Sequence, residues 1–385
     1  MVASFGLFTL GAPTAQARWK VFIWAGVAIW SLLMMWLSIT SRVQSDYVAY
    51  IEQWKLVLSG TDPWSTSNAY GPLHNVFAYL LPLSDLAPRI LFGVMLIIAN
   101  GLLVREIIYV SGVSGVSGIY LLAVSTNFLI TSAAFTYGLN DSLVAVFIIF
   151  AILARVRGYL TLAGCMLGIA IILKYYPVFL VPLFALERGR FRPRIVAGAS
   201  IIAALGLAVA LLVWGESLLR PLILGVNRDP VLLSILSSLQ SYPSFGRYFH
   251  PYFLSRHNAE MVLIAEVAVI VIAWKLRLHW LEASVIGLLM IFIIYKVGQH
   301  YYYIPWLFLV ASLPFTKTSS GKELGMICLP FVLFLSAFQW GYNRYDYYYD
   351  HVIIRQIAGF IAFPLGTATI VTYLWKAFWS RSAEL

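Results

Sequence analysis

The chain has 385 residues, of which 61% are hydrophobic and only 11% are charged, and its formal net charge is +10. A soluble protein of this composition could not cover its surface with polar groups, so lipid must be the solvent for much of the chain. We therefore expect one all-α polytopic membrane domain over residues 1–385, and we assign its positive charge to cytoplasmic loops and membrane lipids, with no nucleic-acid partner.

The first apolar run covers residues 19–40 and carries no charge after Lys20. Roughly 20 apolar residues suffice to cross the hydrocarbon core, so this run is expected to span the membrane. Basic residues in short loops mark the cytoplasmic side. Arg18 and Lys20 therefore place the N-terminus inside, and the basic loops at 155–158 and 187–194 are expected on the same side.

The remaining apolar runs alternate with polar loops, as in a chain that crosses the membrane many times. They lie near 117–134, 140–155, 159–173, 176–187, 194–214, 261–274, 282–298, 301–316, 324–340 and 355–375. In residues 71–110, two apolar runs are separated by a break that contains Pro82 and Pro88. There we expect one full crossing plus a re-entrant or interfacial piece. The count is then about twelve transmembrane helices with both termini inside.

This threading gathers most of the polar, tyrosine-rich segments on the extracytoplasmic face. They are the first loop (41–71), "TYGLND" (136–141), "KYYP" (174–177), the long loop at 215–260, "KVGQHYYY" (296–303) and "YNRYDYYYDH" (342–351). The short cytoplasmic loops contain no glycine-rich phosphate-binding motif. The chemistry is therefore expected on the extracytoplasmic face.

Asp46 follows the first span by a few residues. A carboxylate held at the membrane surface is suited to act as a general base, and the alternative is an ordinary acidic residue in a solvated loop. Glu52 and Asp62 compete for the role. Glu52 points away from the apolar face of the helix predicted after Asp46. Asp62 precedes Pro63 in a turn, where capping is its expected work.

Four apolar side chains after Asp46 recur at helical spacing. They are Tyr47, Tyr50, Ile51 and Trp54, and they predict an amphipathic helix that lies at the membrane surface. The same aromatics also fit a belt at headgroup depth. Gly60 is expected to end this helix.

Two further polar clusters interrupt apolar runs. Lys174 and Tyr175 stand at the outer end of an apolar helix, where the lysine either reaches the headgroups or contacts a phosphate. Lys296, Gln299 and His300 lie between two apolar spans. Polar groups in that position are costly, so we expect them to have a function.

Arg344 and Asp346 lie among several tyrosines near the end of the chain, and they either pair with each other or hold an acceptor. Cys165 and Cys328 both lie within apolar runs and are expected to be core residues. There is no Asp-x-Asp motif and no histidine-rich set of ligands. We therefore expect neither a cofactor nor a metal.

Three stretches resemble a known family. Asp46 with its aromatic helix, "GTDPW" (60–64) and "AYGPLHNVFAYLLPL" (69–83) resemble the first external loop of GT-C glycosyltransferases, most closely the family 87-like polyprenyl-phosphate-mannose-dependent transferases. "AGCMLGIAIILKYYPVFLVPLF" (163–184) and "YKVGQHYYYIPWLFLVASLP" (295–314) are similar to later runs of that family. Gly71 stands where the family pattern has proline, and Trp64 stands where it has tyrosine. Residues 215–260 match no motif of the family.

The resemblance implies a GT-C fold and an inverting transfer of a sugar, with mannose as the first choice, from a polyprenyl-phosphate donor to a lipid or glycolipid acceptor. The reaction would take place on the extracytoplasmic face of a bacterial plasma membrane. The general base would be Asp46. The donor phosphate would be bound by Lys174, Lys296, Arg247 and Arg256. Substrate would be positioned by His300, Gln299, Tyr47, Tyr50, Tyr175, Tyr301 and Arg344.

A second class of function remains open. A polymerase or ligase of lipid-linked glycans would also use arginines in an external loop such as 215–260. A flippase or transporter would favour broken helices in paired positions and internal symmetry, neither of which is evident in the sequence. Consumption of a polyprenyl-phosphate sugar without any gradient distinguishes a transferase from a transporter.

Overall fold

The computed structural model describes residues 15–43, 46–65, 70–112, 115–240, 251–345 and 352–382. The described residues are 82% helical, and they also contain two sheets of two short strands each. The prediction of an all-α polytopic membrane protein is confirmed.

Nearly all the described elements in the first half of the chain are helices. In chain order, the first half contains α1 Ala15–Thr40, α2 Asp46–Leu58, the 3-10 helix η1 Pro72–Leu80, α3 Ala87–Ser111, α4 Val116–Ser125, α5 Phe128–Ile130, the π-helix η2 Thr131–Thr136, α6 Asp141–Val156, α7 Leu160–Leu173, the 3-10 helix η3 Tyr176–Phe179, α8 Leu180–Ala185, β1 Leu186–Glu187 and β2 Arg190–Phe191. Strands β1 and β2 form an antiparallel hairpin.

The second half contains the segment that was expected to be a long loop at 215–260. Its elements are α9 Pro193–Trp214, the 3-10 helix η4 Gly215–Leu219, α10 Arg220–Asn227, β3 Val231–Leu232, α11 Ile235–Gln240, α13 Pro251–Arg256, α14 Asn258–Lys275, α15 Trp280–Ile294, β4 Val297–Gly298, the 3-10 helix η5 His300–Tyr302, α16 Tyr303–Ala311, the 3-10 helix η6 Leu313–Thr316, α17 Ser319–Tyr345 and α18 Val352–Ser382. The described part of 215–260 is therefore largely helical.

In the described part of the chain, six stretches of helix are long and apolar enough to cross a membrane. They are Gln16–Thr40, Ala87–Ser111, Ser117–Thr136, Pro193–Leu219, Ser319–Asn343 and Ile357–Trp379. Shorter apolar helices cover Leu160–Leu173, Tyr176–Ala185 and Trp280–Ile294. The chain is an integral membrane protein, and the count of about twelve crossings stays a prediction.

The region 71–110 divides into one short and one long helix. The 3-10 helix η1 has nine residues and rises about 2 Å per residue, which gives about 18 Å, less than the roughly 30 Å of the hydrocarbon core. Only α3, with 25 residues, is long enough to cross. Pro88 stands in the first turn of α3, where its missing N–H costs nothing.

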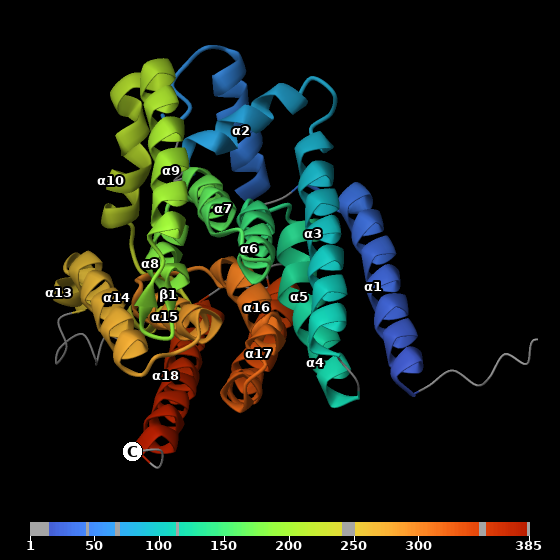
Figure 1. The fold of residues 1–385 in the computed structure, drawn as a ribbon. Coiled ribbons are helices and arrows are strands. Elements are labelled where there is room, and N and C mark those ends of the chain that lie inside the picture. Colours follow the sequence, from blue (N-terminus) through green and yellow to red (C-terminus); the bar gives the residue numbers. More distant parts are fainter. Residues whose placement is uncertain are drawn as a thin grey trace, which may run out of the picture.

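The core of the bundle is built around α6, α7, α15 and α16 (Figure 1), and α1 stands at the outside. Helix α7 packs very closely on α9 because glycines face each other. A Cβ added at Gly164 would lie 2.1 Å from the carbonyl oxygen of Ile195, and one at Gly198 would lie 2.4 Å from that of Thr161. Small residues allow such close approach of membrane helices. This packing fixes the position of the C-terminal end of α7.

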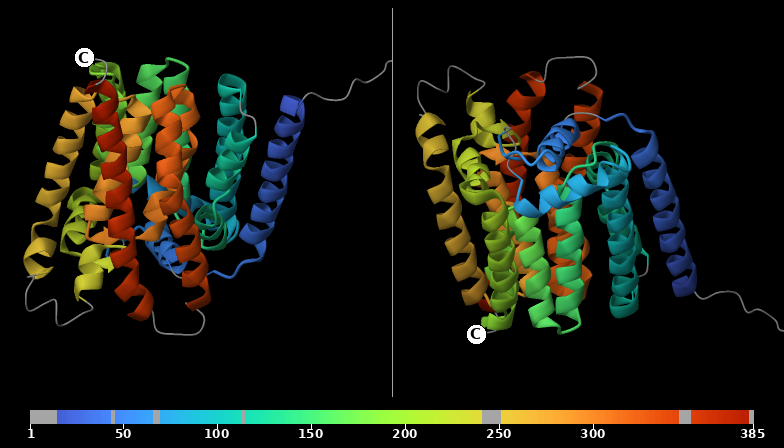
Figure 2. Two further views of the ribbon diagram at one scale, coloured as in Figure 1. Left: turned by 90° about the horizontal axis from the view of Figure 1, so that it is seen from below. Right: turned by 90° about the horizontal axis from the view of Figure 1, so that it is seen from above.

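The two ends of the bundle differ (Figure 2). The start of α1 and the end of α18 lie at one end, which we call the terminal end, together with the β1–β2 hairpin and the turn between α14 and α15. Helix α2 lies at the opposite end, which we call the α2 end. The basic loops and the expected catalytic loop are therefore at opposite ends, as the threading requires.

Candidate active site

Helix α2 presents Asp46 in its first turn and ends before Gly60, which has the left-handed φ of +71°. A carboxylate is favoured in a first helical turn because the backbone N–H groups there have no helical partner. Tyr47, Tyr50, Ile51 and Trp54 are all buried, and Glu52 is exposed. The predicted apolar face, and the prediction that Glu52 points away from it, are confirmed.

Asp62 acts in the turn that was predicted for it. Its Oδ1 accepts a hydrogen bond of 2.9 Å from the backbone N–H of Trp64, which is an Asx turn. Its other carboxylate oxygen pairs with Arg220 at the start of α10. Both oxygens of Asp62 are therefore engaged in structural contacts.

Tyr47 anchors α2 to the next span. Its hydroxyl donates to the carbonyl oxygen of Asp85 at 2.7 Å and accepts from the backbone N–H of Arg89 at 3.1 Å. The Arg89 guanidinium is fully buried and donates to the carbonyl oxygens of Ser38 and Ser41 at the end of α1. We therefore assign Tyr47 a structural role in place of the expected contact with substrate. No pattern in the sequence pointed to Arg89.

Asp46 meets a residue from the far end of the chain. The hydroxyl of Tyr301 donates a hydrogen bond of 2.9 Å to Oδ2 of Asp46, across 255 positions of sequence. Tyr301 lies in η5, and the preceding strand β4 is held by β3 through the bonds Val231 N–H to Lys296 C=O and Leu233 N–H to Gly298 C=O. The structure thus brings together two of the residues that the sequence analysis selected.

Lys174 lies in a buried cluster that also includes Tyr301. Its Nζ is 2.8 Å from Oδ2 of Asp141, and the hydroxyl of Tyr176 donates to Oδ1 of Asp141 at 3.2 Å. The ammonium lies 4.2 Å from the ring centroid of Tyr302 and 5.0 Å from that of Tyr301. Cation–π contacts at such distances are attractive. Lys174 is buried, so it does not reach out to solvent.

Tyr70 completes this cluster because a glycine follows it. The N–H of Gly71 donates to the carbonyl oxygen of Leu173 at 2.9 Å, and a Cβ on Gly71 would lie 2.3 Å from the carbonyl oxygen of Ile172. Only glycine allows the chain to approach the end of α7 so closely. Gly71 is the position that departs from the proline of the family pattern. The Tyr70 ring lies 5.4 Å from Nζ of Lys174.

Arg228 is a second cation of the site. It lies half-buried between α10 and β3. Burial lowers the pKa of Arg228, but its interactions with Tyr302, Tyr301, Tyr70 and Asp46 together raise the pKa by more. The pKa of Arg228 is therefore above its ordinary value. Its guanidinium therefore lies within electrostatic range of residues that also surround Lys174. Its position within 215–260, the segment without a recognisable motif, gave no indication of this role.

The other predicted phosphate-binding cations are Lys296, Arg256 and Arg247. Lys296 is buried, and its Nζ donates to the carbonyl oxygen of Ser255 at 3.2 Å. Arg256 is exposed at the end of α13. Arg247 lies outside the residues that the structure describes. Lys174 is the predicted cation that cation–π contact joins to Tyr301, the partner of Asp46.

His300 lies beside Tyr301 and is buried against aromatic rings. Its ring centroid is 4.8 Å from that of Tyr342 and 5.2 Å from that of Tyr301. Burial lowers the pKa of His300, which stands outside the candidate spans, to about 3, so the imidazole is neutral near pH 7. Its Nδ1 has no hydrogen-bond partner among the described residues. A neutral imidazole can position a hydroxyl group, but it cannot neutralise a phosphate.

The remaining predicted positioning residues differ in their surroundings. Tyr50 packs on Tyr70 with ring centroids 4.7 Å apart, and its hydroxyl accepts from the N–H of Asn140 at 3.3 Å. Tyr175 has a buried hydroxyl without a partner among the described residues. Gln299 is half-buried. Arg344 lies in α17, and its side chain lies outside the described part.

The expectation about metals stays a prediction. Within the described ranges, no three side chains of His, Cys, Asp or Glu come together as a possible metal site. The candidate site combines the carboxylates of Asp46 and Asp141 with the cations of Lys174 and Arg228, and tyrosines lie among them. This arrangement can accept a proton at Asp46 and stabilise negative charge close by.

Comparison with known proteins identifies the family. The sequence model described as glycosyltransferase family 87 matches residues 70–297, more than half of the chain. The matched part includes Tyr70, Asp141, Lys174 and Arg228, whereas Asp46 precedes it and Tyr301 follows it. No curated protein matches the chain in a sequence search. The chain belongs to glycosyltransferase family 87 and is a membrane glycosyltransferase.

Proposed function

We propose that the chain is a GT-C-type transferase that moves a sugar, most simply mannose, from a polyprenyl-phosphate donor to a lipid or glycolipid acceptor with inversion. The observation that carries the proposal is the contact of Asp46 with Tyr301, which also borders Lys174. One carboxylate suited to be a base thus lies beside a cation suited to a phosphate. The proposal needs no cofactor and no metal, and we expect EDTA to leave turnover unchanged.

In the proposed reaction, Asp46 accepts the proton of the acceptor hydroxyl group. The Tyr301 hydroxyl holds Oδ2, so Oδ1 is the atom assigned to the proton. The acceptor oxygen attacks the anomeric carbon, and the bond between that carbon and the phosphate oxygen breaks on the opposite face. The electron pair leaves with the polyprenyl phosphate. Lys174 and Arg228 stabilise its charge, since preorganised cations near a leaving group lower the barrier.

His300 and the tyrosines are proposed to position the acceptor. The unpartnered Nδ1 of His300 is buried, and an unsatisfied polar atom in that setting costs stability unless a ligand completes it. The neutral imidazole can exchange a hydrogen bond with a sugar hydroxyl. Tyr301 then serves both to orient Asp46 and to border the acceptor.

The α2 end is proposed to face away from the cytoplasm. The basic turns gather at the terminal end, and basic loops stay inside. In a chain whose Cys165 and Cys328 are replaced by alanine, a cysteine at exposed Ser65 should react with an impermeant reagent added to intact cells. A cysteine at exposed Ser319 should react only after permeabilisation. The reverse pattern would contradict the proposed face.

The proposed chemistry is tested with the purified full chain in detergent and polyprenyl-phosphate mannose as donor. Asp46→Asn keeps the shape of the side chain but cannot accept the proton, so turnover should fall at least about a hundredfold. Glu52→Gln, which changes an exposed carboxylate of the same helix, is the control and should stay near the wild-type rate.

Two outcomes would overturn these assignments. Wild-type turnover by Asp46→Asn would remove Asp46 as the base. A wild-type protein that cleaves none of the polyprenyl-phosphate sugars offered, while it moves such lipids across a bilayer, would be a flippase and would contradict the transferase mechanism.

A further inference from the structure

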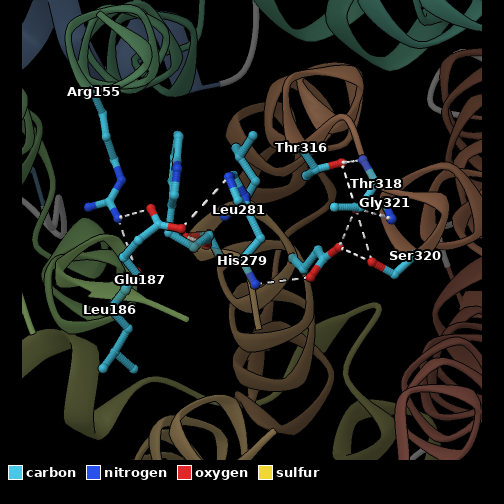
Figure 3. Close-up of polar contacts among 12 residues, drawn as sticks. Arg155, Leu186, Glu187, His279, Leu281, Thr316, Thr318, Ser320 and Gly321 are labelled. Atoms are coloured by element: carbon cyan, nitrogen blue, oxygen red, sulfur yellow. Dashed lines mark hydrogen bonds and ion pairs between the residues drawn. The ribbon is translucent and has the colours of Figure 1, made fainter. Parts of the chain in front are cut away.

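A cleft of about 1500 Å³ opens at the terminal end, far from Asp46. Three turns and one helix form it: the β1–β2 hairpin, the turn between α14 and α15, the start of α17, and Phe378 of α18. Figure 3 shows how polar side chains from these turns meet, and Glu187, His279 and Ser320 among them line the cleft. The proposed reaction uses no residue of this region.

The cleft is strongly basic. Its five cations are Arg188, Arg190, Arg192, Lys275 and Arg277, and all five side chains are exposed. Among the described residues, none of them forms an ion pair with a carboxylate. Two carboxylates, Glu187 and Glu282, also line it. The cleft thus has three more cations than carboxylates.

Both carboxylates are already engaged in hydrogen bonds in the wall of the cleft. Glu187 accepts from the buried guanidinium of Arg155 at 3.0 Å. Glu282 accepts from the hydroxyl of Ser320 at 2.6 Å and from the backbone N–H of His279 at 3.0 Å. Burial together with the charges of Arg155 and Arg188 lowers the pKa of His279 to about 3. The five exposed cations are therefore left for a ligand.

The turns that carry these cations are held in a defined conformation. Arg188 and Arg277 have left-handed φ values of 49° and 44°, which are unfavourable for residues other than glycine. The N–H of Arg188 donates to the carbonyl oxygen of Leu278 at 3.1 Å, and Nε1 of Trp274 donates to that of Gly189 at 3.0 Å. These two hydrogen bonds join the hairpin to the α14–α15 turn. They hold Arg188 and Arg277 in their unfavourable backbone conformations.

Three candidate membrane spans end at this cleft. The span Pro193–Leu219 begins next to Arg192, the span Ser319–Asn343 begins between Thr318 and Ser320, and the span Ile357–Trp379 ends next to Phe378. The cleft therefore lies at the depth where a bilayer changes from hydrocarbon to headgroups. At that depth the phosphates of lipids are the most abundant anions.

We propose that this cleft binds the phosphate headgroup of an anionic membrane lipid. Arginine and lysine suit phosphate oxygens, and basic pockets among membrane helices take such headgroups. Trp274 and Phe378, which are 57% and 60% exposed at the rim, supply apolar surface beside the cations for the chain of the lipid. A soluble phosphate could bind the cations but would not contact this apolar rim.

The test is native mass spectrometry of the purified full chain titrated with phosphatidylglycerol or phosphatidylcholine. The wild type should hold phosphatidylglycerol preferentially. The cleft variant Arg188→Gln/Arg190→Gln/Arg277→Gln should bind it at least roughly tenfold more weakly. The matched control, Arg18→Gln/Lys20→Gln/Arg105→Gln, removes three exposed cations that do not line the cleft and should bind as the wild type does.

The outcomes separate the proposal from its alternatives. Equal retention of both lipids by the wild type would overturn it, as would unchanged phosphatidylglycerol binding by the cleft variant. Displacement of phosphatidylglycerol by excess inorganic phosphate would show that the cleft binds free phosphate, and it would overturn the proposal of a lipid ligand. If the triple variant does not fold, the single variant Arg190→Gln and the lipid preference of the wild type decide the question. Arg190→Gln leaves the strained residues Arg188 and Arg277 in place.

Discussion

The hydroxyl of Tyr301 and the carboxylate of Asp46 lie 2.9 Å apart, although 255 positions separate them in the sequence. The first polar loop and a 3-10 helix late in the chain therefore build one site. The part of the chain that matches the family model lies between them and supplies Lys174, Asp141 and Arg228. This arrangement leads to four predictions beyond those stated with the proposals.

Tyr301→Phe should lower kcat about tenfold or more. The substitution removes the hydrogen bond that orients Asp46, and a bond to a charged group contributes roughly 1.5–3 kcal/mol. Tyr303→Phe is the matched control, because the buried hydroxyl of Tyr303 has no partner among the described residues. Steady-state turnover of both variants is the measurement, and equal kcat values for them would show that Tyr301 does not orient the base.

Arg228→Gln should raise the KM for the polyprenyl-phosphate donor about tenfold while the acceptor KM changes little. Its guanidinium lies within electrostatic range of Tyr301, Tyr302 and Asp46, and a charge-assisted bond from it to a phosphate would be strong. The control is Arg220→Gln, which removes an exposed arginine paired with Asp62; an exposed pair contributes at most about 1 kcal/mol. An unchanged donor KM in Arg228→Gln would remove this residue from the phosphate site.

Lys174→Met should destabilise the protein strongly, by about 3–5 kcal/mol, because it leaves the buried carboxylate of Asp141 without its cation. The double variant Lys174→Met/Asp141→Leu should regain much of that loss, since it removes both charges. Thermal unfolding in detergent measures both effects. A double variant that is no more stable than Lys174→Met would show that the pair is not coupled.

Gly71→Ala should destabilise the site by about 1–3 kcal/mol and reduce turnover. The new Cβ would lie 2.3 Å from the backbone oxygen of Ile172, and such crowding in a packed region forces the backbone to shift. Tyr70 would then move away from Lys174. Gly101→Ala in α3 is the control, because nothing lies within 4 Å of its added Cβ. Equal melting temperatures of the two variants would contradict this account of Gly71.

Local patterns were enough to predict much of the α2 end. The spacing of Tyr47, Tyr50, Ile51 and Trp54 predicted the buried face of α2, and the Asp62–Pro63 pair predicted a turn. Apolar runs predicted where most of the later helices lie. These predictions succeed because helical periodicity, turn chemistry and hydrocarbon thickness all act over a few to about twenty neighbouring residues.

The contacts between distant segments were decided by the tertiary structure alone. Lys174 was expected at a headgroup or a phosphate, and its first partner is Asp141, 33 positions away. Arg228 reaches the site because β3 pairs with β4, and the basic cleft forms because three separate turns are tied together. An apolar pattern shows which face of a helix avoids water, but it contains no information about which other segment covers that face. Which buried charges pair, and which cations remain for a ligand, follows only from that packing.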